Sequence, residues 1–377
     1  MALAKNGPPG NAGSMAGQGK KQAARAPTSH DVARLAGVSR SAVSRCFTEG
    51  ASVAPETRER VLAAAQTLRY RPNLAARSLI TRRSMVVALA ITHLDNQYYP
   101  PVVQRLSEQL GEAGYRLLLY MTHGEASEEP LLDELLRHGV DGLILASRGF
   151  APGLLAQCDA AGLPVVLMNN AGPGAAHASV TGDNLQGGAL VAQFLLAGGH
   201  RRFAYLAGIA GVSSSDERLE GYRAALVAAG AAAPQVADTR FDYDSALAAT
   251  RALLAGAERP DALFCANDHL AFAALQAARE AGLVLGQDLS VVGFDNVTIS
   301  NWPHLALTTY AQPPRAMADA VVESLRALME AGGEGPAQGE QRRIPGALIL
   351  RDTARRPARG VFVRADGSHG WAPPASA

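Results

Sequence analysis

From residue 84 onward, short and almost wholly apolar segments alternate with helical stretches rich in alanine and leucine. The apolar segments read MVVALAI, RLLLYM, GLILAS, PVVLMN, FAYLAG, ALFCAN and LSVVGFD. Strands that are apolar on both faces are typical of parallel sheets covered by helices on either side. Roughly 270 residues of such repeats exceed one doubly wound domain. The pattern therefore predicts an α/β fold of two similar lobes over residues 84–352, with a ligand cleft at the carboxyl ends of the strands.

The charge of the chain is divided unevenly between its two parts. Residues 1–83 contain 14 Lys/Arg and 4 acidic residues, and the rest contains 21 Lys/Arg and 30 acidic residues, so the net charges are +10 and −9. A basic segment on an acidic body is typical of a nucleic-acid-binding head joined to a ligand-binding body. The alternative is a basic, disordered arm without a partner. The capped helical patterns within the basic segment favour the first interpretation.

Two short helical patterns, DVARLAG and RSAVSRCF, are joined by Gly37-Val38-Ser39. Thr28 is a candidate N-cap of the first helix, with Asp31 as its capping-box partner, and Ser39 can cap the second. We expect the first helix to bury Val32, Leu35 and Ala36 and the second to bury Val43 and Phe47. Two helices joined by a tight, glycine-containing turn predict a helix-turn-helix over residues 28–72.

A third helix is predicted to begin near Pro55 and to close a three-helix core, using Val61, Ala64, Leu68 and Tyr70. After the Arg71-Pro72 break, Asn73 can cap a short helix, LAARSLI. So short a helix is marginal in water by itself. We therefore expect a hinge helix and linker over residues 73–83.

The ends of the chain and its cysteines bound the remaining possibilities. We predict that residues 1–27 and 353–377 are disordered tails. The first segment lacks the apolar region of a signal peptide, and Met15 is an alternative start. No run reaches 18 apolar residues, so we expect no membrane span. The three cysteines are far apart and have apolar neighbours, which indicates reduced, structural thiols: Cys46, Cys158 and Cys265. No metal cluster is visible in the sequence, and we expect no cofactor.

In its motifs the chain resembles the LacI/GalR family of bacterial transcription regulators over residues 28–351. The head carries DVARLAGVSRSAVSR, PETRERV and YRPNLAARSL in order. The body carries DNQYYPPVVQRL, VDGLILAS, VTGDNLQGG, ERLEGYRAAL, FCANDHLAFAAL and LSVVGFDNV, which resemble the family's periplasmic-binding-protein-like effector domain. The resemblance implies a helix-turn-helix head, a hinge helix and a two-lobed, doubly wound α/β effector domain.

The resemblance also implies which residues contact DNA. Arg40 and Ser41 match positions that read base edges, and Arg45 matches an arginine that can bond a guanine with two hydrogen bonds. Leu79 matches a leucine that wedges into the minor groove, with Ala76 on the same face. Positions that contact phosphates or cap helices are matched by Thr28, Ser39, Ser44, Thr57 and Asn73. The simpler alternatives are solvated helix-face charges for the arginines and interdomain packing for the leucine. Ile80 stands where many members carry a basic residue.

In the predicted cleft, the resemblance implies contacts to a small effector. Aromatic faces together with amide, carboxylate and guanidinium groups suit a polyhydroxylated ligand such as a sugar. These positions are Asn96, Tyr98, Tyr99, Asn169, Arg218, Tyr243, Asn267, Asp295 and Gln312. Structural alternatives remain, namely an ion pair between Arg218 and Asp295, a helix-capping role for Asn267 and plain packing for Tyr98. Asn169 stands at a position that is frequently acidic.

The leading hypothesis is a homodimeric, effector-responsive repressor that reads a pseudo-palindromic operator in the cytoplasm, on the nucleoid. Whether the effector induces or corepresses is open. A transporter-linked solute-binding protein is the second hypothesis, which the basic head and the missing signal peptide disfavour. An α/β enzyme is the third, but no G-x-G-x-x-G follows the first strand at residues 86–91 and no G-x-S-x-G occurs. Residues 352–377 lack apolar heptads, so we expect a dimer and no tetramer zipper.

Overall fold

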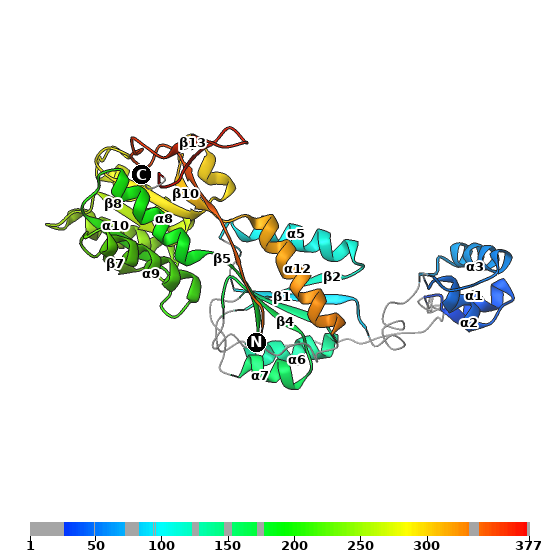
Figure 1. Cartoon of the computed structure of the whole chain (residues 1–377). Helices are drawn as coiled ribbons and strands as arrows, with labels where there is room; N and C mark the ends of the chain where they lie inside the picture. Colours follow the sequence, from blue (N-terminus) through cyan, green and yellow to red (C-terminus); the bar gives the residue numbers. More distant parts are fainter. Residues whose placement is uncertain are drawn as a thin grey trace, which may run out of the picture. The chain divides into compact units, whose positions relative to one another are not determined.

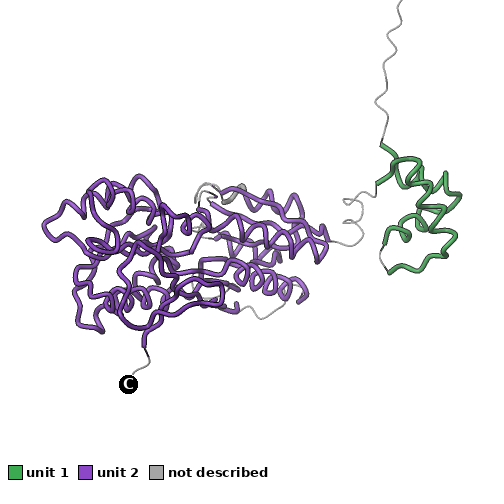
Figure 2. Tube along the Cα trace, turned by 90° about the horizontal axis from the view of Figure 1, so that it is seen from above, with its two compact units in different colours: residues 1–77 green, residues 78–377 purple. Residues whose placement is uncertain are grey.

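The computed structural model divides into two compact units, residues 1–77 and 78–377 (Figure 2). It describes residues 26–48, 50–71, 83–92, 94, 96–122, 128–146, 153–171, 177–331 and 339–374. The expected hinge helix, with Asn73, Ala76 and Leu79, lies outside the described residues, as does nearly all of the expected tail at residues 1–27.

The first unit contains the three predicted helices: α1 (Ser29–Ala36), α2 (Arg40–Cys46) and α3 (Pro55–Leu68). Their buried core is Val32, Ala33, Ala36, Val43, Cys46, Val61, Ala64 and Ala65. One expectation is wrong, since Leu35 is 53% exposed. At about 100° per residue, Ala33 and Leu35 lie on opposite flanks of a stripe centred on Val32 and Ala36. Periodicity alone cannot choose between the flanks, and the structure packs the smaller side chain.

In the second unit, the first lobe is a six-stranded, entirely parallel sheet with the order β11-β5-β4-β3-β1-β2. Helices cover both faces of this sheet (Figure 1). The elements of this lobe are β1 (Val86–Ile91), α5 (Tyr99–Glu112), β2 (Arg116–Met121), α6 (Glu128–His138), β3 (Gly142–Ala146), α7 (Leu154–Ala160), β4 (Val165–Met168), β5 (Ala178–Gly182), α12 (Pro314–Glu330) and β11 (Gln341–Ile344).

Strand β1 shows why the apolar runs are continuous. Val87, Leu89 and Ile91 pack in one cluster with side chains of α5 and α12. Ala88 and Ala90 point to the other face and pack in a second cluster with α6 and α7. Successive side chains of a strand point to opposite faces, and here both faces are covered.

The second lobe is an eight-stranded sheet with the order β13-β14-β12-β10-β9-β8-β6-β7. Strands β6 to β10 pair in parallel, whereas β12, β13 and β14 pair antiparallel. The elements are α8 (Asn184–Ala197), β6 (Phe203–Ala207), α9 (Ser213–Ala228), β7 (Gln235–Asp238), α10 (Tyr243–Ala255), β8 (Ala262–Cys265), α11 (Asp268–Glu280), β9 (Ser290–Asp295), η3 (Thr298–Asn301), β10 (Thr308–Ala311), β12 (Ala347–Leu350), β13 (Val361–Val363) and β14 (His369–Trp371).

Helices α8 and α9 pack unusually close to each other. A Cβ atom at Gly188 would lie 2.1 Å from the carbonyl oxygen of Arg218, and one at Gly221 would lie 1.9 Å from that of Leu185. Only glycine permits so close an approach at both positions. The contact places the first turns of α9, which carry Arg218, directly against the start of α8.

The chain crosses between the lobes three times. The crossovers join β5 to α8, β10 to α12 and β11 to β12. Each is short, and their residues are 183, 312–313 and 345–346. Three short connections let the lobes move relative to each other while both sheets stay intact.

The expectation that residues 353–377 form a disordered tail is wrong for residues 353–374. Strands β13 and β14 form a hairpin that pairs with β12 at the edge of the second sheet. Trp371 is only 3% exposed and packs edge-on against Phe194, with ring centroids 5.7 Å apart. The Arg-, Pro- and Gly-rich composition suggested a tail, but VFV and HGW around Asp366-Gly367 are two short strands and a turn. The second unit thus continues past residue 352.

Two further expectations concern the whole chain. All three cysteines are buried and unbonded. Among the described residues, no helix is both long enough and apolar enough to cross a membrane.

Candidate DNA-reading helix and effector cleft

Helix α2 buries one side and exposes the other. Val43 and Cys46 are buried, whereas Arg40, Ser41, Ser44 and Arg45 are exposed. Ser39 Oγ caps the helix by accepting from the Ala42 amide at 3.2 Å, and it shares a hydrogen bond of 2.9 Å with Ser41 Oγ. No described residue pairs with the guanidinium of Arg40 or Arg45. Both charges are therefore available to a partner.

Two arginines of α3 have a different role. Arg58 donates to the carbonyl oxygens of Cys46 (3.0 Å) and Ala51 (3.2 Å). Arg60 donates from Nε (3.1 Å) and Nη2 (2.7 Å) to the carbonyl oxygen of Ala36. Ala36 and Cys46 end α1 and α2, so these guanidinium groups satisfy carbonyls that a helix end leaves unpaired. Sequence reasoning did not single out these arginines, which fix α1 and α2 against α3.

The other expected DNA-contacting residues have these positions. Thr28 caps α1, with its hydroxyl 2.7 Å and its amide 2.9 Å from Asp31 Oδ2. Thr57 is half-buried in the first turn of α3. Asn73, Ala76 and Leu79 lie outside the described residues, so their contacts stay predictions.

Eight of the nine expected effector residues line one cavity between the lobes. They lie at or just beyond the carboxyl ends of strands in both sheets, or on the helices that follow, where ligands of open α/β sheets bind. The cavity has a volume of about 50 Å³, whereas pockets for small molecules usually span roughly 300–1,000 Å³. Its lining comprises Asn96, Tyr98, Tyr99, Asn169, Val212, Ser214, Arg218, Phe241, Asn267, Asp295 and Gln312.

Three residues of this lining have a left-handed backbone. The φ angles are 58° for Asn169, 59° for Phe241 and 123° for Asp295. Such conformations cost on the order of 1–3 kcal/mol each and concentrate at functional sites. Asn169 directly follows β4, Asp295 is the last residue of β9, and Phe241 lies three residues after β7. In each case the left-handed backbone turns the side chain toward the cavity.

Arg218 is held in one orientation. It is 4% exposed, its Nε donates to Asn184 Oδ1 at 2.9 Å, and its Nη1 donates to the carbonyl oxygen of Ala266. Its guanidinium lies 3.7 Å from the ring centroid of Phe294. It forms no ion pair with Asp295, so the structural alternative of an ion pair is not realised between these two described residues.

The carboxyl group of Asp295 is buried and accepts a hydrogen bond of 2.6 Å from Gln312 Nε2. Burial raises the pKa of Asp295 to about 6, against the opposing effects of the Arg218 charge and hydrogen bonds from Gln312 and Asn96. Nearby Asp268 is also buried and accepts from Thr309 Oγ1 and the Val297 amide. Burial, followed by the charge of Asp295, raises the pKa of Asp268 to about 8. The second lobe therefore holds two carboxyl groups that titrate near neutral pH.

Three buried oxygen atoms of the cavity have no hydrogen-bond partner among the described residues: Tyr98 Oη, Asn169 Oδ1 and Gln312 Oε1. Buried polar atoms are nearly always satisfied, so three atoms without a partner in one cavity indicate a ligand or water. The two amide oxygens are acceptors, and the Tyr98 hydroxyl can donate or accept. A complementary ligand must supply hydrogen-bond donors. Burial also raises the pKa of Tyr98 well above its usual value, so its hydroxyl stays neutral.

Asn267 has two roles. Its Oδ1 accepts from the Leu270 amide at 2.9 Å and caps α11, as the structural alternative anticipated. The residue is also part of the cavity lining. With its acceptor used by the cap, its amide nitrogen is the group left for a ligand.

The expectation for Tyr243 is wrong in position. Its hydroxyl donates to Gln276 on α11 at 2.6 Å, and it is absent from the cavity lining. Arg240 and Phe241 both have positive φ, and Asp242 then caps α10. This tight turn directs Phe241 to the cavity and leaves Tyr243 on the helix. Sequence reasoning also missed Val212 and Ser214. An aromatic residue before an Asp cap was the available signal for Phe241.

We expect Phe241→Leu to weaken effector binding by roughly 2- to 12-fold, the worth of an aromatic face beyond its buried area. Leucine keeps an apolar side chain in the core, so folding should be preserved. Tyr243→Phe removes only the hydroxyl bound to Gln276 and serves as the matched control. Calorimetric titration of both variants checks this. Equal losses in both would mean that Phe241 supplies no face to the ligand.

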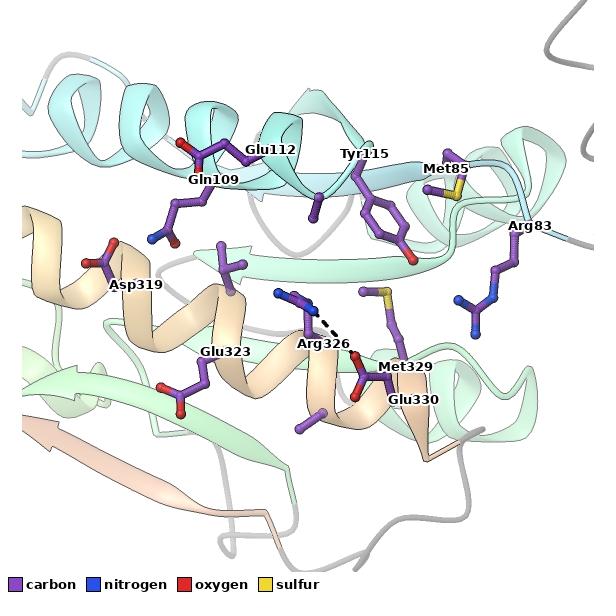
Figure 3. Close-up of a pocket in the computed structure, with 13 residues that line it drawn as sticks. Arg83, Met85, Gln109, Glu112, Tyr115, Asp319, Glu323, Arg326, Met329 and Glu330 are labelled. Atoms are coloured by element: carbon purple, nitrogen blue, oxygen red, sulfur yellow. Dashed lines mark ion pairs between the residues drawn. The ribbon is translucent and has the colours of Figure 1, made fainter. Parts of the chain in front are cut away.

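A second hollow lies outside the cleft, between α5 and α12 in the first lobe (Figure 3). It is an open groove of about 940 Å³. Its floor includes Met85, Tyr115 and Met329, and its rim carries four carboxylates and two arginines: Glu112, Asp319, Glu323, Glu330, Arg83 and Arg326. Arg326 pairs with Glu330 at 3.6 Å. The groove does not contain any residue expected to bind the effector.

A helix-turn-helix with free arginines and a two-lobed α/β domain with a polar cleft define an effector-responsive DNA-binding protein. Residues 28–73 match the family described as bacterial regulatory proteins, lacI family, and residues 192–354 match the periplasmic binding protein-like domain. The HTH-type transcriptional regulator CelR of Thermobifida fusca is 37% identical over 302 residues, which cover 78% of this chain and 89% of that protein. The chain belongs to the LacI family.

Solved structures agree with this assignment. A transcriptional regulator CelR–cellobiose complex is 33% identical, with a TM-score of 0.67 over 87% of this chain and 100% of the other. The lac repressor dimer bound to operator and the anti-inducer ONPF is 27% identical, with a TM-score of 0.77 over 87% of this chain and 99% of the other. The protein is a DNA-binding transcription regulator controlled by a small molecule.

Proposed function

We propose that a polyhydroxylated metabolite, a sugar or sugar derivative, binds between the lobes and sets the affinity of a homodimer for its operator. The observation that carries this proposal is the pair of buried, unpaired acceptors, Asn169 Oδ1 and Gln312 Oε1. Sugar hydroxyls donate to such atoms and accept from Arg218 and Asn267, while C–H faces can stack on Tyr98, Tyr99 or Phe241.

The charge of the cleft favours a ligand with little net charge. One guanidinium, on Arg218, and one carboxyl, on Asp295, roughly cancel, which disfavours a highly phosphorylated ligand. The Arg218 guanidinium could still bind one carboxylate by donating hydrogen bonds to it, so a sugar acid is the second candidate. The related CelR structure, which holds cellobiose, supports a neutral saccharide.

The small cavity ties ligand binding to lobe movement. At about 50 Å³ it is too small for a saccharide, so the lobes must rearrange at their three crossovers to admit one. A ligand that prefers one lobe arrangement shifts the population toward it. If operator binding prefers the other arrangement, affinity falls and the effector is an inducer. If it prefers the same one, the effector is a corepressor.

On DNA, we assign base reading to Arg40, Ser41 and Arg45 of α2, because this face is exposed and its charges are unpaired. Phosphate contacts fall to Ser39, Ser44 and the start of α3 at Thr57, and Thr28 acts as the cap of α1. The hinge residues Asn73, Ala76 and Leu79 are assigned to the operator centre. Acting on chromosomal DNA, the protein would work in the cytoplasm, on the nucleoid, as a regulator and not as an enzyme.

The proposal is tested by titrating the full-length protein with neutral sugars, sugar acids, sugar phosphates and purines, with calorimetry and with an operator gel shift. We expect a neutral sugar or sugar acid to bind and to change operator affinity. Arg218→Ala should weaken that binding roughly 5- to 150-fold through the loss of a buried partner. A purine or sugar phosphate as the sole active compound, or an unchanged affinity in Arg218→Ala, would contradict it.

We also expect effector affinity to fall as the pH drops below about 6, the pKa of Asp295 in the empty cleft. A sugar hydroxyl that donates to the Asp295 carboxylate favours the charged form, so binding lowers this pKa. The effector affinity is therefore at its maximum well above pH 6, and it declines by up to about tenfold per pH unit below pH 6. Calorimetry from pH 5 to 7 measures the slope. Asp295→Asn should remove it, and a slope that persists in this variant would assign the titration to another group.

A further inference from the structure

A chain of polar contacts leads from the effector cleft to the boundary between the lobes. Arg218 Nε donates to Asn184 Oδ1 at 2.9 Å, and Asn184 Nδ2 donates to Glu217 Oε2 at 3.2 Å. Arg343 Nη2 then pairs with Glu217 Oε1 at 3.2 Å. Only Arg218 belongs to the cavity lining. Asn184, Glu217 and Arg343 were not expected to have any role in effector binding.

The donors and acceptors of this chain can be arranged in only one way. A carboxylate accepts but does not donate, so Glu217 must receive the Asn184 amide nitrogen. That interaction leaves Asn184 Oδ1 facing Arg218 Nε, which needs an acceptor. Asn184 is 1% exposed, so its amide is shielded from bulk water and depends on these two partners. Glu217 thus reinforces the amide orientation that presents Asn184 Oδ1 to Arg218.

The polar contacts involve residues next to two of the three crossovers. Asn184 is the first residue of α8, directly after the connection from β5, and Arg343 lies on β11, one residue before that strand ends and the chain crosses to β12. Strand β11 pairs with β5 in the first lobe, whereas Glu217 and Arg218 lie on α9 of the second. The neighbouring Arg342 donates to Glu323 of α12 at 2.9 Å, and Glu323 lines the groove of Figure 3.

We propose that Asn184 is a positioning residue that aims the Arg218 guanidinium at the effector, and that Glu217 and Arg343 tie this orientation to the β11 crossover. The inference rests on the proposed function of Arg218 in the cleft. The Arg343–Glu217 pair is partly exposed, with 49% and 20% of the side chains accessible, so it adds little stability. The pair instead affects the geometry of the cleft. When β11 moves relative to α9, Arg343 pulls on Glu217, and this changes the position of the Asn184 side chain that holds Arg218.

Isosteric substitutions in the protein test the orientation of the Asn184 amide. In Glu217→Gln, residue 217 can donate as well as accept, so a flipped Asn184 amide, which gives Arg218 Nε no acceptor, becomes easier to populate. Adding Asn184→Asp restores a fixed acceptor, because aspartate cannot present a donor to Arg218, while the new amide at position 217 donates to the second aspartate oxygen. Asn184→Ala removes the acceptor altogether. Glu220→Gln is the matched control, since Glu220 is an exposed residue of the same helix.

The first readout is hydrogen exchange of the Arg218 Nε–H group in the full-length, ligand-free protein, followed by ¹⁵N NMR and assigned by its loss in Arg218→Lys. We expect exchange to be roughly tenfold faster in Asn184→Ala, as for a hydrogen bond that is lost. Glu217→Gln should be several-fold faster, and the double variant and Glu220→Gln should match the parent. Unchanged exchange in Asn184→Ala, or a double variant no better than Glu217→Gln, overturns the proposal.

The second readout is calorimetric affinity for cellobiose in the same variants, which should follow the same order. Glu217→Gln and the double variant should have equal thermal unfolding midpoints although their affinities differ. If the role of these residues were purely structural, stability and binding would change together. If the parent gives no heat with cellobiose, a cellobiose-like effector is contradicted, and the exchange order alone decides whether Asn184 positions Arg218. The two proposals can therefore fail separately.

Discussion

Replacing Arg45 with alanine is expected to remove most of the preference for operator over random DNA. Arg45 is exposed on α2, and no described residue pairs with its guanidinium. An arginine bonded to a guanine edge contributes ~1–3 kcal/mol of discrimination, and a dimer on a pseudo-palindrome makes the contact twice, so the total loss is roughly 2–6 kcal/mol. Affinities for operator and random duplex at one fixed salt concentration measure this difference.

Arg34→Ala is the matched control for this result. Arg34 is equally a surface arginine of the head, but it lies on α1 and pairs with Asp31 at 2.9 Å. Its loss should lower both affinities by a small and similar factor, as expected for a general charge effect. If Arg45→Ala also lowers both affinities equally, Arg45 contacts only phosphate, and base reading belongs to other residues of α2.

Much of this architecture could be predicted from sequence because local signals and tertiary demands agree. Continuous apolar strands such as VVALAI require cover on both faces, and the structure provides it. Ser39 Oγ accepts from a helix amide as expected, and Asp31 accepts from the Thr28 amide as its expected capping-box partner. Eight expected cleft residues meet because parallel strands place their carboxyl ends at one edge.

The errors arise where a side chain's direction depends on contacts that sequence spacing does not encode. Tyr243 and Phe241 are two residues apart, and only the positive φ angles of Arg240 and Phe241 decide which one faces the cavity. Arg58 and Arg60 looked like further positive charge of the head, yet they hold helix ends. The Asn184–Glu217–Arg343 contacts join segments distant in sequence, with nothing local to mark them.

The C-terminal hairpin was missed for a related reason. Strands of three residues are too short to show a convincing alternation, and arginine, proline and glycine dominate their surroundings. Their order comes from β12, which supplies the pairing edge, and from the pocket for Trp371 beside Phe194. The family match ends at residue 354, so the hairpin lies beyond the part of the chain that resembles the periplasmic binding protein-like domain.

Trp371→Ala is therefore expected to lower the free energy of unfolding of the effector domain by ~3–5 kcal/mol, the usual cost of emptying a buried tryptophan site. The substitution removes the packing against Phe194 and leaves the Arg359 carbonyl without the indole donor that now lies 2.9 Å away. Urea unfolding measures the change, and hydrogen exchange of residues 361–371 shows whether the hairpin detaches first. The only other tryptophan, Trp302, is 50% exposed, so Trp302→Ala should cost far less. Equal stability of the two variants, with rapid exchange of the hairpin in the parent, would instead favour the disordered tail that the sequence predicted.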